Sequence, residues 1–251
     1  MELSAPARRP APRISVVVPA LNEAENLVHV LPRIPADVFE VVLIDGGSGD
    51  ATVEVARRLI PDVRVVHQSG RGKGDALISG FRHTRGDIIV MLDADGSARP
   101  EEIPRFVEVL VAGADFAKGS RFLPGGGSAD ITRLRALGNA VLTRIVNGLF
   151  GSRYSDLCYG YNAFWARVLP SLALDATGFE IETQLNLRAV KAGLAVVEVP
   201  SYEDARISGA SNLNAFRDGL RVLRTIMHEK AVPPSVSPTP VGPLHDAVEE
   251  V

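Results

Sequence analysis

Short apolar runs alternate regularly with longer amphipathic stretches between residues 13 and 119. The runs are rich in β-branched residues and apolar on both faces, which is typical of strands covered on each side. Parallel neighbours need a crossover connection, and the amphipathic stretches between the runs can supply it. We therefore predict an α/β fold with a doubly wound, Rossmann-like, mostly parallel sheet and helices on both faces. The predicted strands cover residues 14–18, 40–44, 63–66, 87–92 and 115–119.

The predicted helices between these strands have start signals of their own. Asn22 can cap the first helix, because Glu25 follows three residues later and can reach back to it. Asp50 is placed to cap the second helix, and a third is expected over residues 75–84. The fourth ends near Gly113. Its apolar face is formed by Ile103, Phe106, Val107 and Leu110.

Length and composition favour one domain with unstructured ends. A chain of 251 residues, 46% of them hydrophobic, can bury the core of one large α/β domain. Residues 1–12 are rich in Pro, Ala and Arg but contain no apolar signal core, so we expect a disordered lead. Residues 231–251 are rich in proline and are expected to form a disordered tail. A single domain is placed at residues 13–230.

The distribution of charged and apolar residues limits where the protein can reside and which partners it can bind. No window approaches the roughly 20 uninterrupted apolar residues that span a bilayer, so we expect a soluble or peripheral protein. The single cysteine, Cys158, excludes an internal disulfide and fits a reducing compartment. The 27 basic and 30 acidic residues give a net charge of −3, which offers no general reason to bind nucleic acid. We expect a cytoplasmic protein, and peripheral contact with the inner membrane face stays open.

Every predicted strand is followed directly by a polar motif. In doubly wound sheets, ligands bind beyond the carboxyl ends of the strands, so these motifs are expected to share one site. Asp93 and Asp95 would project from one face of an extended backbone and together attract a cation. A solvated turn is the plain alternative, since Gly96 and Pro100 are typical of a turn leading into a helix. The motifs are PALNE, DGGSGD, GRGKGD, DADGS and KGSRF.

These segments resemble a known family when they are taken together. In order and spacing, VPALNEAENL, LIDGGSGDAT, GRGKGDALISGF, GDIIVMLDADGS and GSRF are similar to the inverting family 2 glycosyltransferases with the glycosyltransferase-A fold. The closest resemblance is to the dolichyl- and polyprenyl-phosphate sugar (mannose or glucose) synthases, over roughly residues 13 to 212. Each motif alone is weak, whereas the ordered set is specific. The resemblance implies a hexosyltransferase that moves a sugar from a nucleoside diphosphate sugar to a polyprenyl phosphate.

The resemblance also implies which residues bind the donor nucleotide. Asp45 matches the first acidic residue of the family's Asp-Asp-Gly-Ser motif, but Gly46 replaces the second, so the nucleobase stays open. Lys73 could neutralise the diphosphate, with the glycines around it allowing close backbone approach, although a solvated turn lysine is an alternative. The segment that matches the family's nucleotide-binding start is Pro19, Ala20, Leu21, Asn22 and Glu23.

The Asp-x-Asp motif of the family is Asp93, Ala94 and Asp95 in this chain. By the resemblance, its two carboxylates would hold the metal ion of a nucleotide-sugar complex. Oxygen ligands suit Mg²⁺ or Mn²⁺, and either ion would stabilise the departing diphosphate as a Lewis acid. Ser97 is a weaker candidate for a further ligand.

By the same resemblance, the acceptor side lies downstream of the fifth strand. Asp156 opens a stretch similar to the family's Asp-x-x-x-Gly-Phe-Arg, and Glu182 matches an acidic residue that faces the reaction centre. We assign both to catalysis, with Glu182 as general base if the acceptor is a hydroxyl. Glu180 is the rival for that role, and a surface glutamate on a helix is the plain alternative.

A lipid-phosphate acceptor needs cations rather than a base. Two cations that the resemblance leads us to expect are missing, because Asn162 and Asn212 stand in their positions. The segment 131–150 has a broad apolar surface that suits a membrane, the core or a dimer interface. The predicted acceptor contacts are Arg121, Arg133 and Arg206, with Arg135 as a further candidate.

Other functions remain as alternatives. The same transfer onto a soluble hydroxyl acceptor, such as a natural product or a glycan precursor, stays open because two cations are missing. The altered DGGS motif alone favours a non-catalytic nucleotide-sugar-binding module. A nucleotidyltransferase is remote, because the expected glycine-rich loop with Arg and Lys does not follow the first strand.

Overall fold

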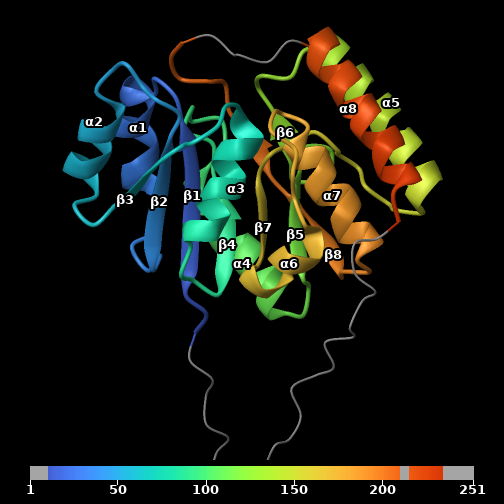
Figure 1. Cartoon of the computed structure of the whole chain (residues 1–251), viewed down its shortest axis with the longest axis horizontal. Coiled ribbons are helices and arrows are strands. Elements are labelled where there is room, and N and C mark those ends of the chain that lie inside the picture. The colour runs from blue at the N-terminus through green and yellow to red at the C-terminus, as the bar shows by residue number, and fades with distance from the viewer. Residues whose placement is uncertain (1–10, 210–214, 234–251) are drawn as a thin grey trace, which may run out of the picture.

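A seven-stranded sheet forms the centre of the protein, as the computed structural model shows for residues 11–209 and 215–233 (Figure 1). The strand order is β3-β2-β1-β4-β7-β5-β8, and every neighbouring pair is parallel except those of β7. The doubly wound α/β prediction is therefore confirmed. The strands are β1 (Ile14–Ala20), β2 (Glu40–Asp45), β3 (Arg64–His67), β4 (Ile88–Met91), β5 (Phe116–Ser120), β7 (Asn162–Trp165) and β8 (Val196–Pro200).

Helices cover both faces of this sheet, as its apolar strands require. Along β1, Val16 and Val18 belong to one core cluster and Val17 to the other, because successive side chains point to opposite faces. One face is covered by α1 (Ala24–Val30), α2 (Thr52–Leu59) and α4 (Ile103–Val111). The opposite face is covered by α3 (Lys73–His83), α6 (Leu169–Leu172) and α7 (Ile181–Lys191). Short 3₁₀ turns cover Leu31–Arg33, Pro100–Glu102 and Ala166–Val168.

The five predicted strands are present, with bounds that differ from the prediction by at most two residues. The sequence did not point to β7, which is inserted between β4 and β5 and runs antiparallel to both. This strand spans only Asn162–Trp165 and is reached from β5 through the long α5 helix. A four-residue strand that follows such a long connection has no sequence pattern long enough to predict it.

The predicted cap of α1 is wrong. Asn22 adopts a left-handed conformation with φ 57°, and its side chain accepts a hydrogen bond from the Gly49 N–H at 2.8 Å. The first N–H of α1, at Ala24, instead donates to Asp50 Oδ2 at 3.1 Å. Asp50 also accepts from the N–H of Thr52, the first residue of α2, at 3.0 Å. One carboxylate thus binds the starts of two helices and ties the loops after β1 and β2 together.

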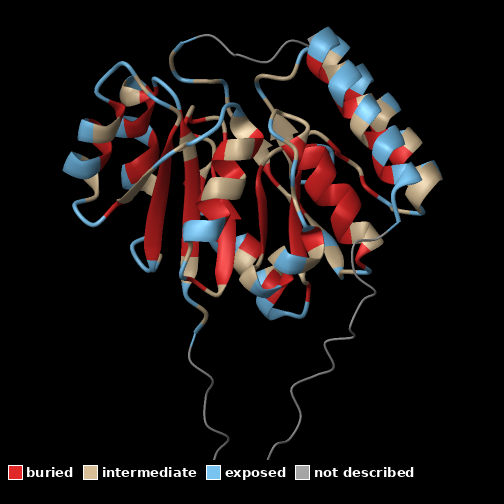
Figure 2. Cartoon of the chain, in the orientation of Figure 1, coloured by how far each residue is buried: buried red, intermediate tan, exposed pale blue. Residues whose placement is uncertain are grey.

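A second layer of helices lies outside α7. Helices α5 (Arg133–Phe150) and α8 (Ala215–Ala231) run side by side there (Figure 1). Buried Glu229 on α8 accepts from Arg188 Nε at 2.7 Å and from Lys191 Nζ at 2.6 Å, which fixes α8 to α7. Both outer helices keep much of their surface exposed, whereas α7 is largely buried (Figure 2). No helix in the described part of the chain is both long and apolar enough to cross a bilayer.

Two short strands, β6 (Gly127–Ser128) and β9 (Tyr202–Glu203), pair in parallel beside the main sheet. The predicted disordered lead and tail fall mostly on residues 1–10 and 234–251, which lie outside the described residues, as does Asn212. The domain bounds therefore stay a prediction.

Candidate active site

Asp93 and Asp95 lie just beyond β4, at the carboxyl edge of the sheet. Asp95 Oδ1 accepts hydrogen bonds from the N–H and the hydroxyl of Ser97, at 3.0 and 2.7 Å, which fixes this carboxylate in a short turn. Asp95 Oδ2 lies 3.1 Å from Arg206 Nη1, and Asp93 Oδ1 lies 2.7 Å from Lys73 Nζ. The two aspartate side chains keep 31% and 23% of their surface exposed. Each predicted metal carboxylate is therefore open to solvent and paired with one cation.

This donor set fits Mg²⁺ or Mn²⁺. Both ions prefer oxygen ligands and keep several positions for water and phosphate oxygens. Within residues 11–209 and 215–233, no cluster of three or more His, Cys, Asp or Glu side chains could hold a metal ion. The two carboxylates can therefore bind a divalent cation only together with further ligands, such as those of a diphosphate.

Lys73 joins the predicted metal site to the predicted base. Its Nζ lies 2.7 Å from Asp93 Oδ1 and 2.6 Å from Oε1 of Glu182, in the first turn of α7. Burial lowers the pKa of Lys73, but the two carboxylates outweigh burial and raise it. Burial also raises the pKa of Glu182 above its ordinary value, with Lys73 opposing this shift and Asp93 adding to it. Lys73 is therefore a cation, and Glu182 holds its proton more tightly than an exposed glutamate does.

The glycines around Lys73 pack against protein backbone. The N–H of Gly74 donates to the Thr177 carbonyl at 2.9 Å, and a Cβ at Gly72 or Gly74 would collide with the backbone of residues 176–177. We predicted that these glycines allow a diphosphate to approach. In the structure, Gly72 and Gly74 allow the segment before α7 to approach, and their role toward a diphosphate stays a prediction.

Arg206 lies among the carboxylates of the donor motifs. Besides Asp95, its guanidinium contacts Glu23, at the start of α1. Its Nε donates to the Ser208 carbonyl at 2.7 Å, and the Ser208 hydroxyl donates to Glu25 at 2.5 Å. Through Arg206 and Ser208, the segment after β9 is held against Glu23 and Glu25 at the start of α1, and Arg206 also contacts Asp95. We assigned Arg206 to the acceptor, whereas the structure places it with the predicted nucleotide and metal residues.

The remaining predicted nucleotide residues lie at the same edge of the sheet. Asp45 ends β2, where it accepts from the Ser48 N–H at 3.0 Å and lies 3.2 Å from His67 Nδ1. Burial would raise the pKa of Asp45, but the hydrogen bonds from Ser48 and His67 lower it below its ordinary value. A Cβ added to Gly46 would lie 3.3 Å from Gln68 Oε1, which is a tight contact. A larger side chain at this position would therefore displace the Gln68 amide.

The segment of residues 19–23 connects the same edge to α1. Pro19 and Ala20 pair with Ile44 and Asp45 at the ends of β1 and β2. Leu21 follows with 46% of its surface exposed, and Ala94, between the two metal aspartates, is buried. The structure thus brings the predicted donor residues together at one edge, and their roles stay predictions.

Arg121 and Asp156 form a buried ion pair. Arg121 Nε lies 2.7 Å from Asp156 Oδ2, and its Nη1 lies 3.0 Å from Glu203 Oε2. Burial would raise the pKa of Asp156, but the hydrogen bonds and charge of Arg121 lower it below its ordinary value. Asp156 is fully buried, so the geometry makes it a partner of Arg121 rather than a group open to substrate. Its catalytic assignment and the acceptor assignment of Arg121 stay predictions.

Two further polar residues, on the neighbouring strands β5 and β7, are fully buried. Lys118 on β5 has no exposed surface and donates to the carbonyls of Gly119 and Tyr159, at 2.8 and 2.9 Å. Burial lowers its pKa. Asn162 lies opposite Lys118 on β7 and is also fully buried. The sequence analysis included Lys118 only as the first residue of the KGSRF motif and assigned it no role, although a lysine beside the apolar Phe116 and Ala117 of a predicted strand was a signal that could have been used.

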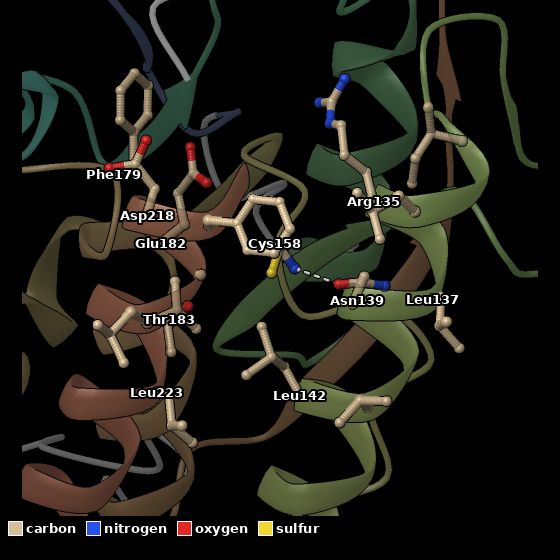
Figure 3. A pocket seen from close by; sticks show the side chains of 18 of the residues that line it. Arg135, Leu137, Asn139, Leu142, Cys158, Phe179, Glu182, Thr183, Asp218 and Leu223 are labelled. Atoms are coloured by element: carbon tan, nitrogen blue, oxygen red, sulfur yellow. Dashed lines mark hydrogen bonds between the residues drawn. The ribbon is translucent and has the colours of Figure 1, made fainter. Parts of the chain in front are cut away.

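A pocket of about 550 Å³ opens between α5, α7 and α8 (Figure 3). Glu182 on α7 and Arg135 on α5 lie on opposite sides of it. Arg135 is held by Asp130 at 2.7 Å, whereas Arg133 is exposed and does not line the pocket. The structure therefore places Arg135, and not Arg133, beside this space. Most of the lining is apolar and includes Leu134, Leu137, Val141, Leu142, Phe179, Phe216, Leu220 and Leu223.

Comparison with known proteins gives consistent matches. The chain matches Glycosyl transferase family 2 over residues 15–169. It is 34% identical over 219 residues to the polyprenol monophosphomannose synthase of Mycolicibacterium smegmatis, covering 82% of this chain and 83% of the relative. It is 34% identical over 217 residues to the undecaprenyl-phosphate mannosyltransferase of Micrococcus luteus, covering 80% of this chain and 88% of the relative.

The match to a solved structure supports the fold assignment. Glucosyl-3-phosphoglycerate synthase from Mycobacterium tuberculosis, in complex with Mn²⁺, UDP-glucose and phosphoglyceric acid, matches with a TM-score of 0.71 and 27% identity. The match covers 89% of this chain and 82% of that chain. The ordered strand-end motifs, the sheet topology and these matches agree, and the chain therefore belongs to glycosyl transferase family 2 and is a glycosyltransferase with the glycosyltransferase-A fold.

Proposed function

We propose that this enzyme is metal-dependent and inverting, and that it transfers a hexose from a nucleoside diphosphate sugar to a polyprenyl phosphate. The observation that carries the proposal is the pocket between α5, α7 and α8. It runs from an exposed apolar rim, where Leu137 is 62% and Phe216 is 80% exposed, to Glu182 beside the Lys73–Asp93 pair. An acceptor with an apolar chain and an anionic head suits such a pocket. The names of the Mycolicibacterium and Micrococcus relatives support the same acceptor class.

In this proposal Asp93 and Asp95 hold Mg²⁺ or Mn²⁺. The ion would supply Lewis-acid stabilisation of the leaving diphosphate. Lys73 and Arg206 contact the same two aspartates and add positive charge beside that group. The presence of Mn²⁺ and UDP-glucose in the related synthase supports this donor chemistry.

The transfer itself requires no base when the acceptor is a phosphate. An anionic phosphate oxygen forms a bond to the anomeric carbon while the bond to the diphosphate oxygen breaks and its electron pair leaves with the diphosphate. Attack from the face opposite the leaving group inverts the anomeric configuration. In this proposal Arg135, which lines the pocket, receives the acceptor phosphate.

We further propose that α5 and α8 make peripheral contact with an anionic membrane, where such an acceptor would reside. Exposed apolar residues on these helices lie among exposed arginines, a combination that favours binding at a lipid headgroup surface. A homodimer through the same face is the alternative, and the cytoplasmic location stays a prediction. The apolar residues are Leu134, Leu137, Val141, Phe216 and Leu220, and the arginines are Arg133, Arg217, Arg221 and Arg224.

A second candidate function is transfer onto a soluble hydroxyl acceptor. Glu182 is buried, has a raised pKa and lies at the junction of the donor residues and the pocket, which are properties of a general base. The related synthase with bound phosphoglyceric acid supports this alternative.

The test is the fate of a radiolabelled sugar. The protein is incubated with Mn²⁺, a panel of labelled nucleoside diphosphate sugars, and either short polyprenyl phosphates or soluble hydroxyl acceptors. We expect label in the organic phase with polyprenyl phosphate. Leu137→Asp, at the pocket rim, should reduce that transfer by about tenfold or more because a charge enters an apolar path. Val111→Asp, at an exposed apolar position on α4, is the matched control and should not. Label in a soluble product alone would establish the second candidate.

A further inference from the structure

Two cations and four carboxylates form two ion-pair groups at the predicted donor site, one around each predicted metal aspartate. Lys73 lies between Asp93 and Glu182, at 2.7 and 2.6 Å. Arg206 lies between Asp95, at 3.1 Å, and Glu23. Each predicted metal carboxylate therefore shares a cation with a second acid. Both cations are largely withdrawn from water, with 14% and 20% of their side-chain surface exposed.

This arrangement opposes binding of a metal ion alone. A divalent cation on Asp93 and Asp95 would lie beside two positive side chains, and solvent screens such charges weakly because they are partly buried. A diphosphate changes the balance, since it brings negative charge that both side chains can bind. Lys73 has a flexible four-carbon stem and Arg206 a planar fork of donors, and both suit phosphate oxygens.

We propose that Lys73 and Arg206 are exchangeable counter-ions of the two metal carboxylates. They disfavour the metal ion by itself, and the incoming diphosphate draws them away from Asp93 and Asp95, so that metal and nucleotide bind as a cooperative pair. This inference rests on the proposed function, because it takes the ligand to be a nucleoside diphosphate with a divalent metal. It goes further in making both side chains competitors of the free metal ion as well as contacts of the diphosphate.

The backbone around Lys73 is closely packed, so the proposed exchange of partners would involve movement of the side chain and not of the backbone. Gly74 is hydrogen-bonded to Thr177, and the backbone of Gly160 lies so close to the Lys73–Glu182 pair that a Cβ there would come within 3.2 Å of Lys73 Nζ. The start of α3 is thus held by the segment before α7, and the Lys73 side chain is packed against Gly160. Movement of Lys73 toward a diphosphate would also loosen its contact with Glu182, so donor binding would free the carboxylate that faces the acceptor pocket.

The experiment measures metal and nucleotide affinities separately. Free Mn²⁺ is followed by electron paramagnetic resonance, alone and with GDP or UDP, and nucleotide binding is measured by calorimetry with and without Mn²⁺. In the unaltered protein we expect Mn²⁺ to bind at least about tenfold more tightly when the preferred nucleotide is present, and the nucleotide to gain by the same factor from Mn²⁺.

The variants should move the two affinities in opposite directions. Lys73→Met and Arg206→Met should each bind Mn²⁺ alone about tenfold more tightly and the nucleotide about tenfold more weakly, because a competing cation and a phosphate partner are lost together. Lys73→Arg should keep the cooperativity. Arg33→Met removes a surface cation that pairs with Glu101 at 2.7 Å, and should change neither affinity.

A purely structural role predicts a different result. Parallel weakening of both affinities in Lys73→Met and Arg206→Met, or independent binding of Mn²⁺ and nucleotide in the unaltered protein, would overturn the inference and leave the proposed function standing. If Lys73→Met fails to fold, as judged by its melting temperature, Arg206→Met decides alone, since Arg206 comes from a separate segment. Failure of the unaltered protein to bind any nucleoside diphosphate with Mn²⁺ would overturn the proposed function itself.

Discussion

The predicted donor side and the predicted acceptor side of this enzyme are built in different ways. On the donor side, Asp93 and Asp95 stand at the end of a strand, partly open to solvent, and each is paired with a cation. On the acceptor side, Arg121 is enclosed by Asp156 and Glu203, and the walls between α5 and α8 are mostly apolar (Figure 3). The donor side thus offers charges for a small ionic group, and the acceptor side offers apolar surface and shape.

Lys73 connects the two sides through Asp93 and Glu182. If the two sides differ in this way, substitutions on the donor side should change the local charge and the affinity for the metal ion. Substitutions on the acceptor side should act through stability or the affinity for an apolar acceptor.

The largest effect is expected for Asp95→Asn on the donor side. Loss of one of two metal carboxylates should reduce turnover by roughly 10³-fold, because charge stabilisation of the leaving group is a large catalytic term. The fold should persist, since Asp95 lies at a strand exit and keeps 23% of its side-chain surface exposed. Turnover, Mn²⁺ affinity and melting temperature are the measurements, with the exposed Asp62→Asn as control. Full activity in Asp95→Asn would contradict the metal site.

Asp156→Asn tests the acceptor side through stability. Removing one partner from a buried ion pair should lower the free energy of unfolding by about 3–5 kcal/mol. The pKa of Asp156 is lowered in the folded protein, so its contribution to stability is present above the ordinary aspartate value of 3.8 and is lost as the pH falls through the folded pKa. Urea unfolding should therefore show a weaker loss of stability in acid for the variant. Lost turnover with unchanged stability would instead support the predicted catalytic role.

The two sides also differ in how far the sequence predicted them. The gathering of the predicted donor residues at one edge of the sheet could be expected, because most of them follow their strands within a few positions and the topology rule for parallel sheets places such positions together. Their roles stay predictions. The predicted contact of Asp50 with the start of α2 is local and is present, whereas the cap of α1 was not found, because the Asp50 carboxylate reaches the start of α1 from a separate loop. A short-range capping pattern cannot express such a contact.

The acceptor side depends on contacts between distant segments. Arg121 meets Glu203 across 82 residues, and Lys73 meets Glu182 across 109 residues. The pocket is formed by three helices whose packing is fixed partly by Glu229, Arg188 and Lys191. The sequence identified the apolar surface of α5, but it did not decide whether this surface faces a membrane, the core or a dimer partner. Only the folded arrangement shows that its exposed apolar residues form the rim of a pocket.

Arg206→Ala tests on which side of the site Arg206 acts, because the resemblance assigned it to the acceptor and the structure places it beside Asp95 and Glu23. From the contacts with Asp95 and Glu23, we expect the KM for the donor to rise roughly ten- to hundredfold, as expected for losing a charge-assisted hydrogen bond. The KM for polyprenyl phosphate should change much less. Initial rates with each substrate varied in turn measure both constants, and Arg33→Ala is the surface control. A larger change in the acceptor KM would restore our assignment of Arg206 to the acceptor.

The smallest effect is expected for Glu182→Gln, the residue at which the two sides meet. A phosphate acceptor attacks as an anion, so glutamine, which keeps the size and much of the hydrogen bonding, should lower turnover with polyprenyl phosphate by less than about tenfold. A hydroxyl acceptor would need its proton removed, and the same substitution would then reduce turnover by roughly 10²–10⁴-fold. Glu180→Gln, two residues away, is the matched control and also tests the rival base. Turnover of each variant with both acceptor classes gives the answer. A large loss with polyprenyl phosphate would show that Glu182 contributes more to the transfer than the ion pair with Lys73, and that the acceptor side contains a reacting group as well as an apolar surface.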